Sequence, residues 1–190
     1  MIRSMVAAGR GRLGLAAVLV AMCATGAAQA QTSPVSVYLE AGRAPHDGAN
    51  TNTATVGVRV PTPATFFEGR VTLAVDAYVS GWKTNPVPGA DSRLTQIGVV
   101  PMFRYKLSES KAAWFVEGGV GASYLTSGYR SLRKEFSTRW NFSDHLGVGR
   151  SFGADGRHEL GLYVKHVSNA GLKEPNPGET FYLLRYAYAL

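Results

Sequence analysis

Long stretches of alternating apolar and polar side chains restrict the fold of this sequence more than any other feature. The segment 93–107 has large apolar groups on one face and polar or small groups on the other, namely Ile97, Val99, Phe103, Tyr105 and Leu107 against Gln96, Gly98, Arg104 and Lys106. Alternation of period two predicts a β-strand. Soluble sheets usually contain strands of about five or six residues, whereas a tilted membrane crossing needs about ten.

Clusters of Gly, Pro, Asn and Asp interrupt the alternation and divide the chain into eight expected strands: 35–44, 52–61, 67–80, 93–107, 112–126, 136–152, 157–168 and 180–190. Short connections are expected near 62–66, 108–111 and 153–156, and long ones near 45–51, 81–92, 127–135 and 169–179. Connections that alternate in length are typical of outer-membrane barrels. We therefore predict an all-β fold, an eight-stranded antiparallel transmembrane β-barrel of the outer membrane, with an interior filled by side chains. A soluble sandwich would share the alternation, but not the strand length or the polar inner face.

Two further segments assign side chains to the two faces of the barrel. In 112–126 we expect Trp114, Val116, Val120 and Tyr124 to face lipid and Phe115, Glu117, Gly119, Gly121 and Ser123 to face inward. In 136–152 we expect Phe136, Trp140, Phe142, Leu146, Val148 and Phe152 to face lipid and Ser137, Arg139, Asn141, Ser143 and His145 to face inward. Inward Glu117 and His145 are expected to pair with Arg104 or Arg139, because buried charges need partners. An interfacial aromatic belt is expected to include Trp82, Trp140, Tyr124 and Tyr129.

The N-terminus has the pattern of a secretory signal peptide. Residues 1–12 carry three arginines and no acid, and the apolar run 13–24 that follows is too short to span a bilayer as a helix. Ala28-Gln29-Ala30 supplies the small residues of a cleavage site, so we predict a signal peptide over 1–30 and the barrel over 31–190. Met22 before Cys23 argues against lipidation of that cysteine. The expected location is the bacterial outer membrane, reached by export.

Composition excludes several other classes of protein. The formal net charge of +7 includes the three arginines of the leader, so the remaining chain carries only +4 and does not indicate nucleic-acid binding. The single cysteine excludes a disulfide scaffold. His46, Asp47 and His158 do not have the spacing of metal ligands. No metal site and no organic cofactor are expected.

His166 and Ser168 stand at the end of the seventh expected strand. They are two residues apart, so they share a face with Leu160, Leu162 and Val164, which is the lipid side. Polar groups at membrane depth are candidates for function. An imidazole beside a hydroxyl can accept its proton and so activate it as a nucleophile. Alternatively, the two residues are an ordinary polar strand end at the membrane interface.

The run His166-Val167-Ser168-Asn169-Ala170-Gly171-Leu172-Lys173, with Pro175-Asn176 and Gly178-Glu179, resembles the lipid A 3-O-deacylase (PagL) family. The resemblance implies an outer-membrane serine esterase that hydrolyses the 3-O-linked acyl chain of lipid A, with lipopolysaccharide as substrate and outer-membrane lipid as surroundings. It implies Ser168 as nucleophile, His166 as base and Glu179 as the acid that orients His166. The spacing between Ser168 and the acid is one residue shorter than in the family, so Glu174 remains an alternative.

Other features of the proposed site are less determined. The parity of the last strand places Glu179 on the inward side unless a bulge near Gly178 re-aims it. Asn169, the backbone amide of Gly171, and Asn176 are candidates for the oxyanion hole, although Asn-Ala-Gly is also ordinary turn chemistry.

A basic loop and two rival functions complete the expectations. Arg130, Arg133 and Lys134 are candidate contacts for the phosphates of lipid A, or simply a solvated loop. The rival functions are a non-enzymatic barrel for adhesion or membrane integrity and a lipid A acyltransferase, which would need an interior acyl pocket beside Gly119 and Gly121. The sequence is compatible with either a monomer or a homodimer.

Overall fold

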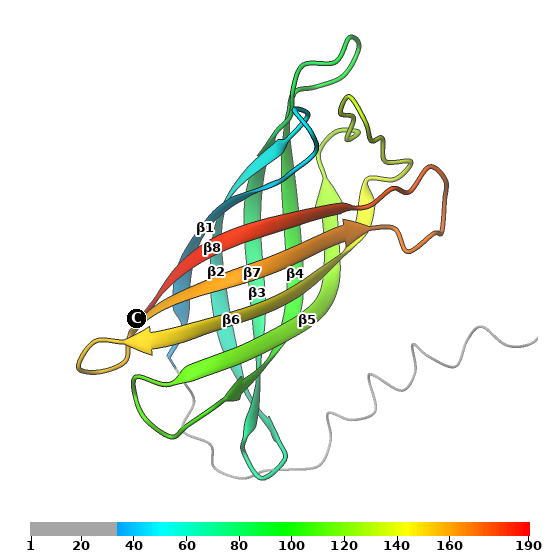
Figure 1. Ribbon diagram of the computed structural model, residues 1–190. Coiled ribbons are helices and arrows are strands. Elements are labelled where there is room, and N and C mark those ends of the chain that lie inside the picture. Colours follow the sequence, from blue (N-terminus) through cyan, green and yellow to red (C-terminus); the bar gives the residue numbers. More distant parts are fainter. Residues whose placement is uncertain (1–33) are drawn as a thin grey trace, which may run out of the picture.

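The computed structural model describes residues 34–190 as one closed barrel of antiparallel strands, in which each strand pairs with the next and β8 pairs back with β1 (Figure 1). The strands are β1 (Ser36–Ala44), β2 (Thr51–Phe66), β3 (Val71–Lys83), β4 (Arg93–Lys106), β5 (Trp114–Leu125), β6 (Trp140–Phe152), β7 (His158–Ser168) and β8 (Glu179–Ala189). The eight expected strands are thus confirmed. The expected signal peptide, 1–30, lies outside the described residues.

The connections separate the barrel into two unlike ends. The connections 67–70, 107–113 and 153–157 lie at the end that also holds the C-terminus, and 45–50, 84–92, 126–139 and 169–178 lie at the other (Figure 1). In outer-membrane barrels the longer connections are extracellular. The ends of β1, β3, β5 and β7 therefore lie at the outer leaflet. Among residues 34–190, no helix is long and apolar enough to cross a membrane.

The first short turn lies later than the sequence predicts. Instead of ending near residue 61, β2 continues to Phe66, and the chain turns at 67–70 with positive φ at Phe67, Glu68 and Gly69. The pairing of β2 with β3 shifts between Pro61 and Thr65. Proline has no N–H for the ladder, so a bulge passes over this segment and pairing resumes beyond it.

Three aromatic side chains lie inside the barrel rather than at its lipid surface. β6 begins at Trp140, not at residue 136, and the expected outward position of Phe136 is wrong. Phe136 packs on Tyr129 with ring centroids 4.7 Å apart, and Tyr129 in turn contacts Trp82 at 5.4 Å. The predicted belt is therefore wrong for Trp82 and Tyr129, which are buried, whereas Trp140 is 68% exposed. Loop residues have no fixed alternation, so parity could not place Phe136.

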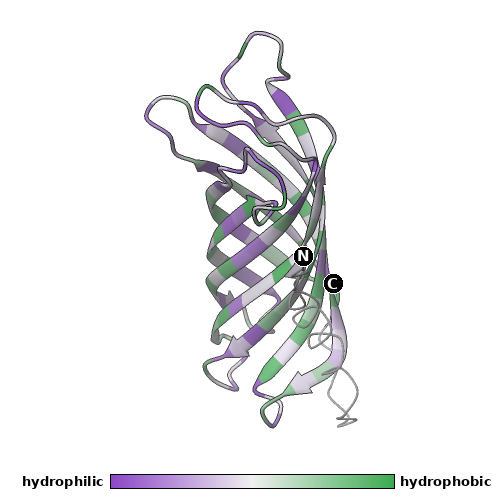
Figure 2. Cartoon of the chain, turned by 90° about the vertical axis from the view of Figure 1, so that its right-hand side faces the viewer, coloured by the Kyte–Doolittle hydropathy of each residue, from purple (hydrophilic) through white to green (hydrophobic). Residues whose placement is uncertain are grey.

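Within the strands, the predicted faces are confirmed. The outward positions of β4 are exposed while their neighbours Leu94, Val100 and Met102 are buried. The same alternation runs through β5 and β6, and Figure 2 shows alternating hydrophobic and hydrophilic residues along the strands. A barrel in lipid requires this arrangement, because its outer wall must be apolar while its inner wall packs on itself.

Paired charges fill the middle of the lumen. Glu117 accepts hydrogen bonds from Arg59 at 2.7 Å and from Arg104 at 2.6 Å. Arg185 pairs with Glu40 at 2.7 Å and with Asp76 at 2.9 Å. The expected pair of Glu117 with Arg104 is therefore confirmed.

The other two inward charges behave differently from the expectation. His145 makes a hydrogen bond of 3.0 Å with Ser143, not with an arginine. Arg139 is exposed and lies over the ring of Tyr124 at 4.7 Å, so its expected inward position is wrong. Because Arg139 precedes β6 rather than lying within it, the alternation of the strand does not govern where it points.

We predict that Glu117→Gln destabilises the folded barrel by about 3–5 kcal/mol, because it leaves Arg59 and Arg104 as partly uncompensated buried charges. The measurement is the free energy of unfolding in urea, with the barrel in lipid vesicles. Glu109→Gln, in the exposed connection 107–113, is the matched control and should change little. Equal unfolding free energies for both variants would contradict a supporting role for the lumen network.

Candidate functional site

His166 and Ser168 lie at the outer-leaflet end of β7, on the outer wall. Leu160, Leu162 and Val164 precede them on the same face and are 47%, 63% and 38% exposed. Both polar residues are partly exposed in the same alternation, which agrees with the outward orientation expected from parity. The imidazole and the hydroxyl therefore face the bilayer, not the lumen.

Residues on both neighbouring strands flank the imidazole of His166. In the sheet register, His166 lies opposite Thr180 on β8 and opposite Asp144 on β6. A hydrogen bond of 2.9 Å joins Nδ1 of His166 to Oγ1 of Thr180. When Nδ1 carries the proton and donates it to Thr180, Nε2 has a free lone pair and can act as a base.

Gly178 closes the site from the side of the last loop. Its φ is +59°, and a Cβ placed there would lie 2.6 Å from Cε1 and 2.9 Å from Nε2 of His166. The same Cβ would lie 3.5 Å from Cβ of Ser168. The backbone of Gly178 therefore packs directly against the reactive edge of the imidazole, which requires a residue without a side chain.

The chain after Ser168 turns sharply and points the amide of Ala170 back toward the hydroxyl. The amide of Ala170 lies 3.4 Å from Oγ of Ser168, and Ala170 and Gly171 both have positive φ, +53° and +75°. The amide of Gly171 donates to Oδ1 of Asn169 at 3.0 Å. The amide of Gly171 is therefore used within the turn, and the amide of Ala170 is the one that bonds Oγ of Ser168.

The two asparagines have different roles in this loop. Asn169 is buried, and its Nδ2 donates to the carbonyl of Lys173 at 2.7 Å and to the hydroxyls of Ser137 and Thr138 at 3.2 Å. This side chain holds connection 169–178 against connection 126–139. Asn176 accepts the amide of Asn169 through Oδ1 at 3.0 Å. Within residues 34–190 its Nδ2 has no hydrogen-bond partner, so this donor is available in the loop that follows Ser168.

Glu179 lies on the inner side of β8 and does not contact His166. Its Oε1 is 2.7 Å from Nε2 of His46 and 3.3 Å from Nζ of Lys134, and its Oε2 accepts the hydroxyl of Tyr129. Burial and the neighbouring carboxylate raise the pKa of Tyr129, so this phenol stays protonated and donates. Parity predicted this inward position. Two contacts link Glu179 to the site: the amide of Thr180 donates to its Oε1 at 3.1 Å, and Lys134 bridges Oε1 and the carbonyl of Gly178.

Of the other two carboxylates near the site, only Asp144 lies beside the imidazole. Glu174 accepts the amide of Asn176 at 2.8 Å within its own loop. Asp144 occupies an outward position of β6 next to His166, and its buried Oδ1 has no hydrogen-bond partner among the described residues. Sequence reasoning missed Asp144, although it lies between Phe142 and Leu146 on the apolar face and the alternation alone could have singled it out.

The basic side chains of connection 126–139 have partners within the protein. Arg130 pairs with Glu135 at 3.2 Å, and Arg133 lies 3.8 Å from Asp47. Lys134 donates to the carbonyl of Gly178 at 2.7 Å as well as to Glu179. Lys134 therefore holds the loop that carries Gly178. Arg130 and Arg133 are half-exposed, and surface ion pairs such as theirs contribute little stability.

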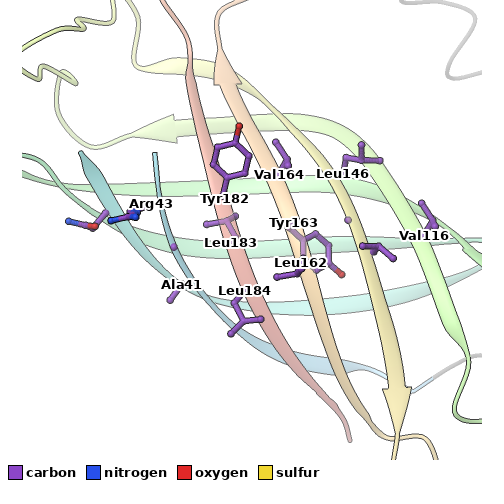
Figure 3. Close-up of a pocket in the computed structure, with 14 residues that line it drawn as sticks. Ala41, Arg43, Val116, Leu146, Leu162, Tyr163, Val164, Tyr182, Leu183 and Leu184 are labelled. Atoms are coloured by element: carbon purple, nitrogen blue, oxygen red, sulfur yellow. The ribbon is translucent and has the colours of Figure 1, made fainter. Parts of the chain in front are cut away.

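An apolar groove of about 930 Å³ runs along the outer wall below His166 and Ser168 (Figure 3). Its lining includes Leu162, Val164 and Tyr163 of β7 and Tyr182 and Leu184 of β8. Gly42 and Gly147 also line it through their backbone, and a Cβ on either would collide with the backbone of Tyr182 or the ring of Tyr163. Among residues 34–190, no group of three or more His, Cys, Asp or Glu side chains could hold a metal ion.

Comparison with known proteins gives consistent matches. A family model described as lipid A 3-O-deacylase (PagL) matches residues 52–189. The chain is 31% identical over 176 residues to lipid A deacylase PagL of Bordetella bronchiseptica, covering 90% of each chain. It is 31% identical over 173 residues to the Pseudomonas aeruginosa protein of that name, covering 90% of this chain and 94% of the relative. In fold it is similar to the crystal structure of the outer membrane enzyme PagL, with a TM-score of 0.68, 23% identity and coverage of 82% of this chain and 99% of that one.

We predict that Gly178→Ala slows covalent labelling of Ser168 by a fluorophosphonate about 100-fold, because the added Cβ displaces the imidazole. Gly89→Ala is the matched control. Gly89 has a similar positive φ of +74° in another connection, and a Cβ there would meet no atom within 4 Å. Labelling at the normal rate in Gly178→Ala would mean that the close packing of this glycine is not needed for reactivity.

Proposed function

This chain belongs to the lipid A 3-O-deacylase (PagL) family, and we propose that it removes the 3-O-linked acyl chain through a covalent intermediate on Ser168. The protein is an outer-membrane hydrolase that acts on lipid A. The observation that carries the proposed mechanism is the pair of His166 and Ser168 on the lipid-facing side of β7, with Nδ1 of His166 bonded to Thr180. Such a pair on the outer wall can reach an ester that stays in the bilayer.

The chemistry follows from the free Nε2 of His166. Nε2 takes the proton of Ser168 as Oγ attacks the ester carbonyl, and then gives this proton to the departing 3-oxygen of the sugar. Lipid A leaves with a free hydroxyl, and Ser168 holds the acyl chain. In the second half, Nε2 takes a proton from water, the resulting hydroxide attacks the acyl carbonyl, and the proton returns to Ser168. The products are a fatty acid and a lipid A with one chain fewer.

We propose Asn176 Nδ2 and the amide of Ala170 as the donors that stabilise the tetrahedral intermediates. Nδ2 of Asn176 has no partner in the described chain, and the amide of Ala170 already points at Oγ of Ser168. One preorganised donor of this kind contributes about 3 kcal/mol to the barrier reduction. Asn169 and Gly171, also expected at this position, have the supporting role of holding the turn.

Glu179 remains the proposed acid, acting on His166 through Thr180. Its Oε1 accepts the amide of Thr180, whose hydroxyl meets Nδ1 of His166. Replacing Glu179 would loosen this hold on Thr180 and on the tautomer of the imidazole. Asp144 is the carboxylate next to His166 in the register, and a negative charge there favours the imidazolium formed during the reaction.

The groove offers a place for the acyl chain. Its lining reaches Val164, two residues before His166 on β7, and consists largely of apolar side chains of β6, β7 and β8. A chain lying in it would continue in the direction of the surrounding lipid tails while its ester lies at Ser168. Every group of the proposed site comes from one chain, so the mechanism requires no second copy.

Neither rival function fits the described residues. A non-enzymatic barrel disagrees with membership of a family of deacylases. The acyltransferase required an acyl pocket beside Gly119 and Gly121, but a Cβ on either would lie within 2.2 Å of the β4 backbone. The side chains of Met102 and Val100 also lie 2.8 Å from these two Cβ positions, so the described structure offers no acyl pocket directly beside the glycines. Export by a signal peptide over 1–30 remains part of the proposal.

Ser168→Ala should abolish deacylation while leaving the barrel folded, because a hydroxyl on the outer wall supports no core. The measurement is mass spectrometry of lipid A from cells that make the wild-type or variant protein, with heat-modifiable migration as the check on folding. Ser127→Ala, in a long connection away from the pair, should retain activity. Wild-type release of the 3-O-acyl chain by Ser168→Ala would exclude the serine mechanism.

Glu179→Gln should reduce kcat more than Glu174→Gln, because only Glu179 holds Thr180 against His166. The expected loss of kcat exceeds tenfold for Glu179→Gln, because a catalytic imidazole that is no longer oriented loses much of its activity. For Glu174→Gln the expected loss of kcat is about twofold or less. Asp144→Asn provides the comparison for direct electrostatic support of the imidazolium. A larger loss for Glu174→Gln than for Glu179→Gln would overturn the assignment of the acid.

A further inference from the structure

Three cations and an amide form a continuous row on the outer wall, which starts at the edge of the groove and runs away from the catalytic pair. Arg43 on β1 lies opposite Asn52 on β2, Asn52 lies opposite Lys83 on β3, and Lys83 lies opposite Arg93 on β4. All four side chains are exposed. The row therefore crosses four neighbouring strands at their outer-leaflet ends.

These cations have no anionic partner within the described chain. Among residues 34–190, no carboxylate lies within ion-pair distance of Arg43, Lys83 or Arg93, and this includes Asp91, two residues before Arg93. By contrast, Arg59 and Arg104 of the lumen and Arg130 and Arg133 of connection 126–139 have carboxylate partners. Like charges directly opposite each other destabilise a sheet, so the pair Lys83–Arg93 calls for an anion from outside the protein.

The surrounding rows set the depth of this cationic row in the membrane. Four residues toward the membrane centre lies a row of large apolar side chains, Leu39, Val56, Val79 and Ile97, which are 63%, 57%, 46% and 50% exposed. Between the two lies a row of small side chains, Ala41, Ala54, Gly81 and Thr95. Four residues correspond to about 13 Å along a strand. The order apolar, small, cationic follows the order of hydrocarbon, ester region and phosphates in a lipid leaflet.

The position round the barrel separates this row from the catalytic site. β3 lies four strands from β7 in either direction round the closed barrel, so Lys83 is diametrically opposite His166 and Ser168. A lipid whose ester lies at Ser168 cannot also reach Lys83 and Arg93. Arg43 and Asn52 lie nearer the site and border the groove, so they form the end of the row closest to the substrate, and Lys83 and Arg93 form the far end.

We propose that Arg43, Asn52, Lys83 and Arg93 bind the phosphorylated headgroup of a second lipid A molecule, which is held at the wall and is not hydrolysed. The three strand spacings from Arg43 to Arg93 amount to about 14 Å. That span suits a disaccharide with a phosphate at each end better than a headgroup with one phosphate. Phosphates accept charge-assisted hydrogen bonds from Lys and Arg, and Asn52 adds a neutral donor between them. The small row below leaves room for the acylated sugar.

The test counts bound lipid in a catalytically inactive Ser168→Ala background by native mass spectrometry. The probe is hexa-acylated lipid A with both phosphates, titrated onto the folded barrel in detergent. Two adducts are expected, one at the catalytic wall and one at the row. Adding Lys83→Gln and Arg93→Gln should weaken the second adduct about 30-fold, the usual effect of removing two cations beside anionic headgroups, and leave the first unchanged.

Lys106→Gln with Lys111→Gln is the matched control, because it removes the same charge from exposed positions at the other end of the barrel. Both adducts should persist in it. Lipid A stripped of its phosphates should form only the first adduct. The proposal is overturned if the Lys83 and Arg93 double variant keeps the second adduct, if the control pair loses it equally, or if phosphate-free lipid A forms it. Displacement by an equal concentration of phosphatidylglycerol would show that a phospholipid, not lipid A, is the occupant.

Discussion

Closure of the sheet by β1 and β8 is the interaction on which the rest of the molecule depends. Residues 36–43 of β1 pair with 182–189 of β8, so no strand edge is left to face a solvent that cannot hydrogen-bond it. Once the sheet is closed, its two faces obey opposite rules. The outer wall must be apolar, and the inner wall must satisfy its own polar groups, as the pairs of Glu117 and Arg185 do.

The candidate site is an exception to these rules. His166, Ser168 and Asp144 are polar groups on the apolar wall, placed side by side because β7 lies between β6 and β8. The lumen supports them from behind: Glu179, Lys134 and Tyr129 hold the start of β8 and the loop with Gly178. The geometry of the site on the outer wall thus depends on contacts in the lumen. The connection is made by β8, where inward Glu179 is followed by outward Thr180.

The sequence predicts the barrel well because alternation reports directly on which face meets lipid. It predicts the outward orientation of His166 and Ser168 for the same reason. It fails where the chain leaves a strand: Phe136 and Arg139 lie in a long connection, and the bulge after Pro61 moves the first turn. The partners of Asn169, Asn176 and Glu179 depend on contacts between distant loops, which no local pattern contains. Alternation places Asp144 on the lipid-facing side of β6, but only the pairing of β6 with β7 shows that it lies beside His166.

A lumen filled with paired charges and aromatic rings leaves the barrel without a passage from one side of the membrane to the other. Both the reactant and the shortened product must therefore arrive and leave sideways, by diffusion within one leaflet. The turnover of such an enzyme depends on the surface density of lipid A around it, not on any concentration in solution. Tight packing or cross-linking of neighbouring lipopolysaccharides by divalent cations would slow catalysis by restricting lateral supply, even with every side chain of the protein in place.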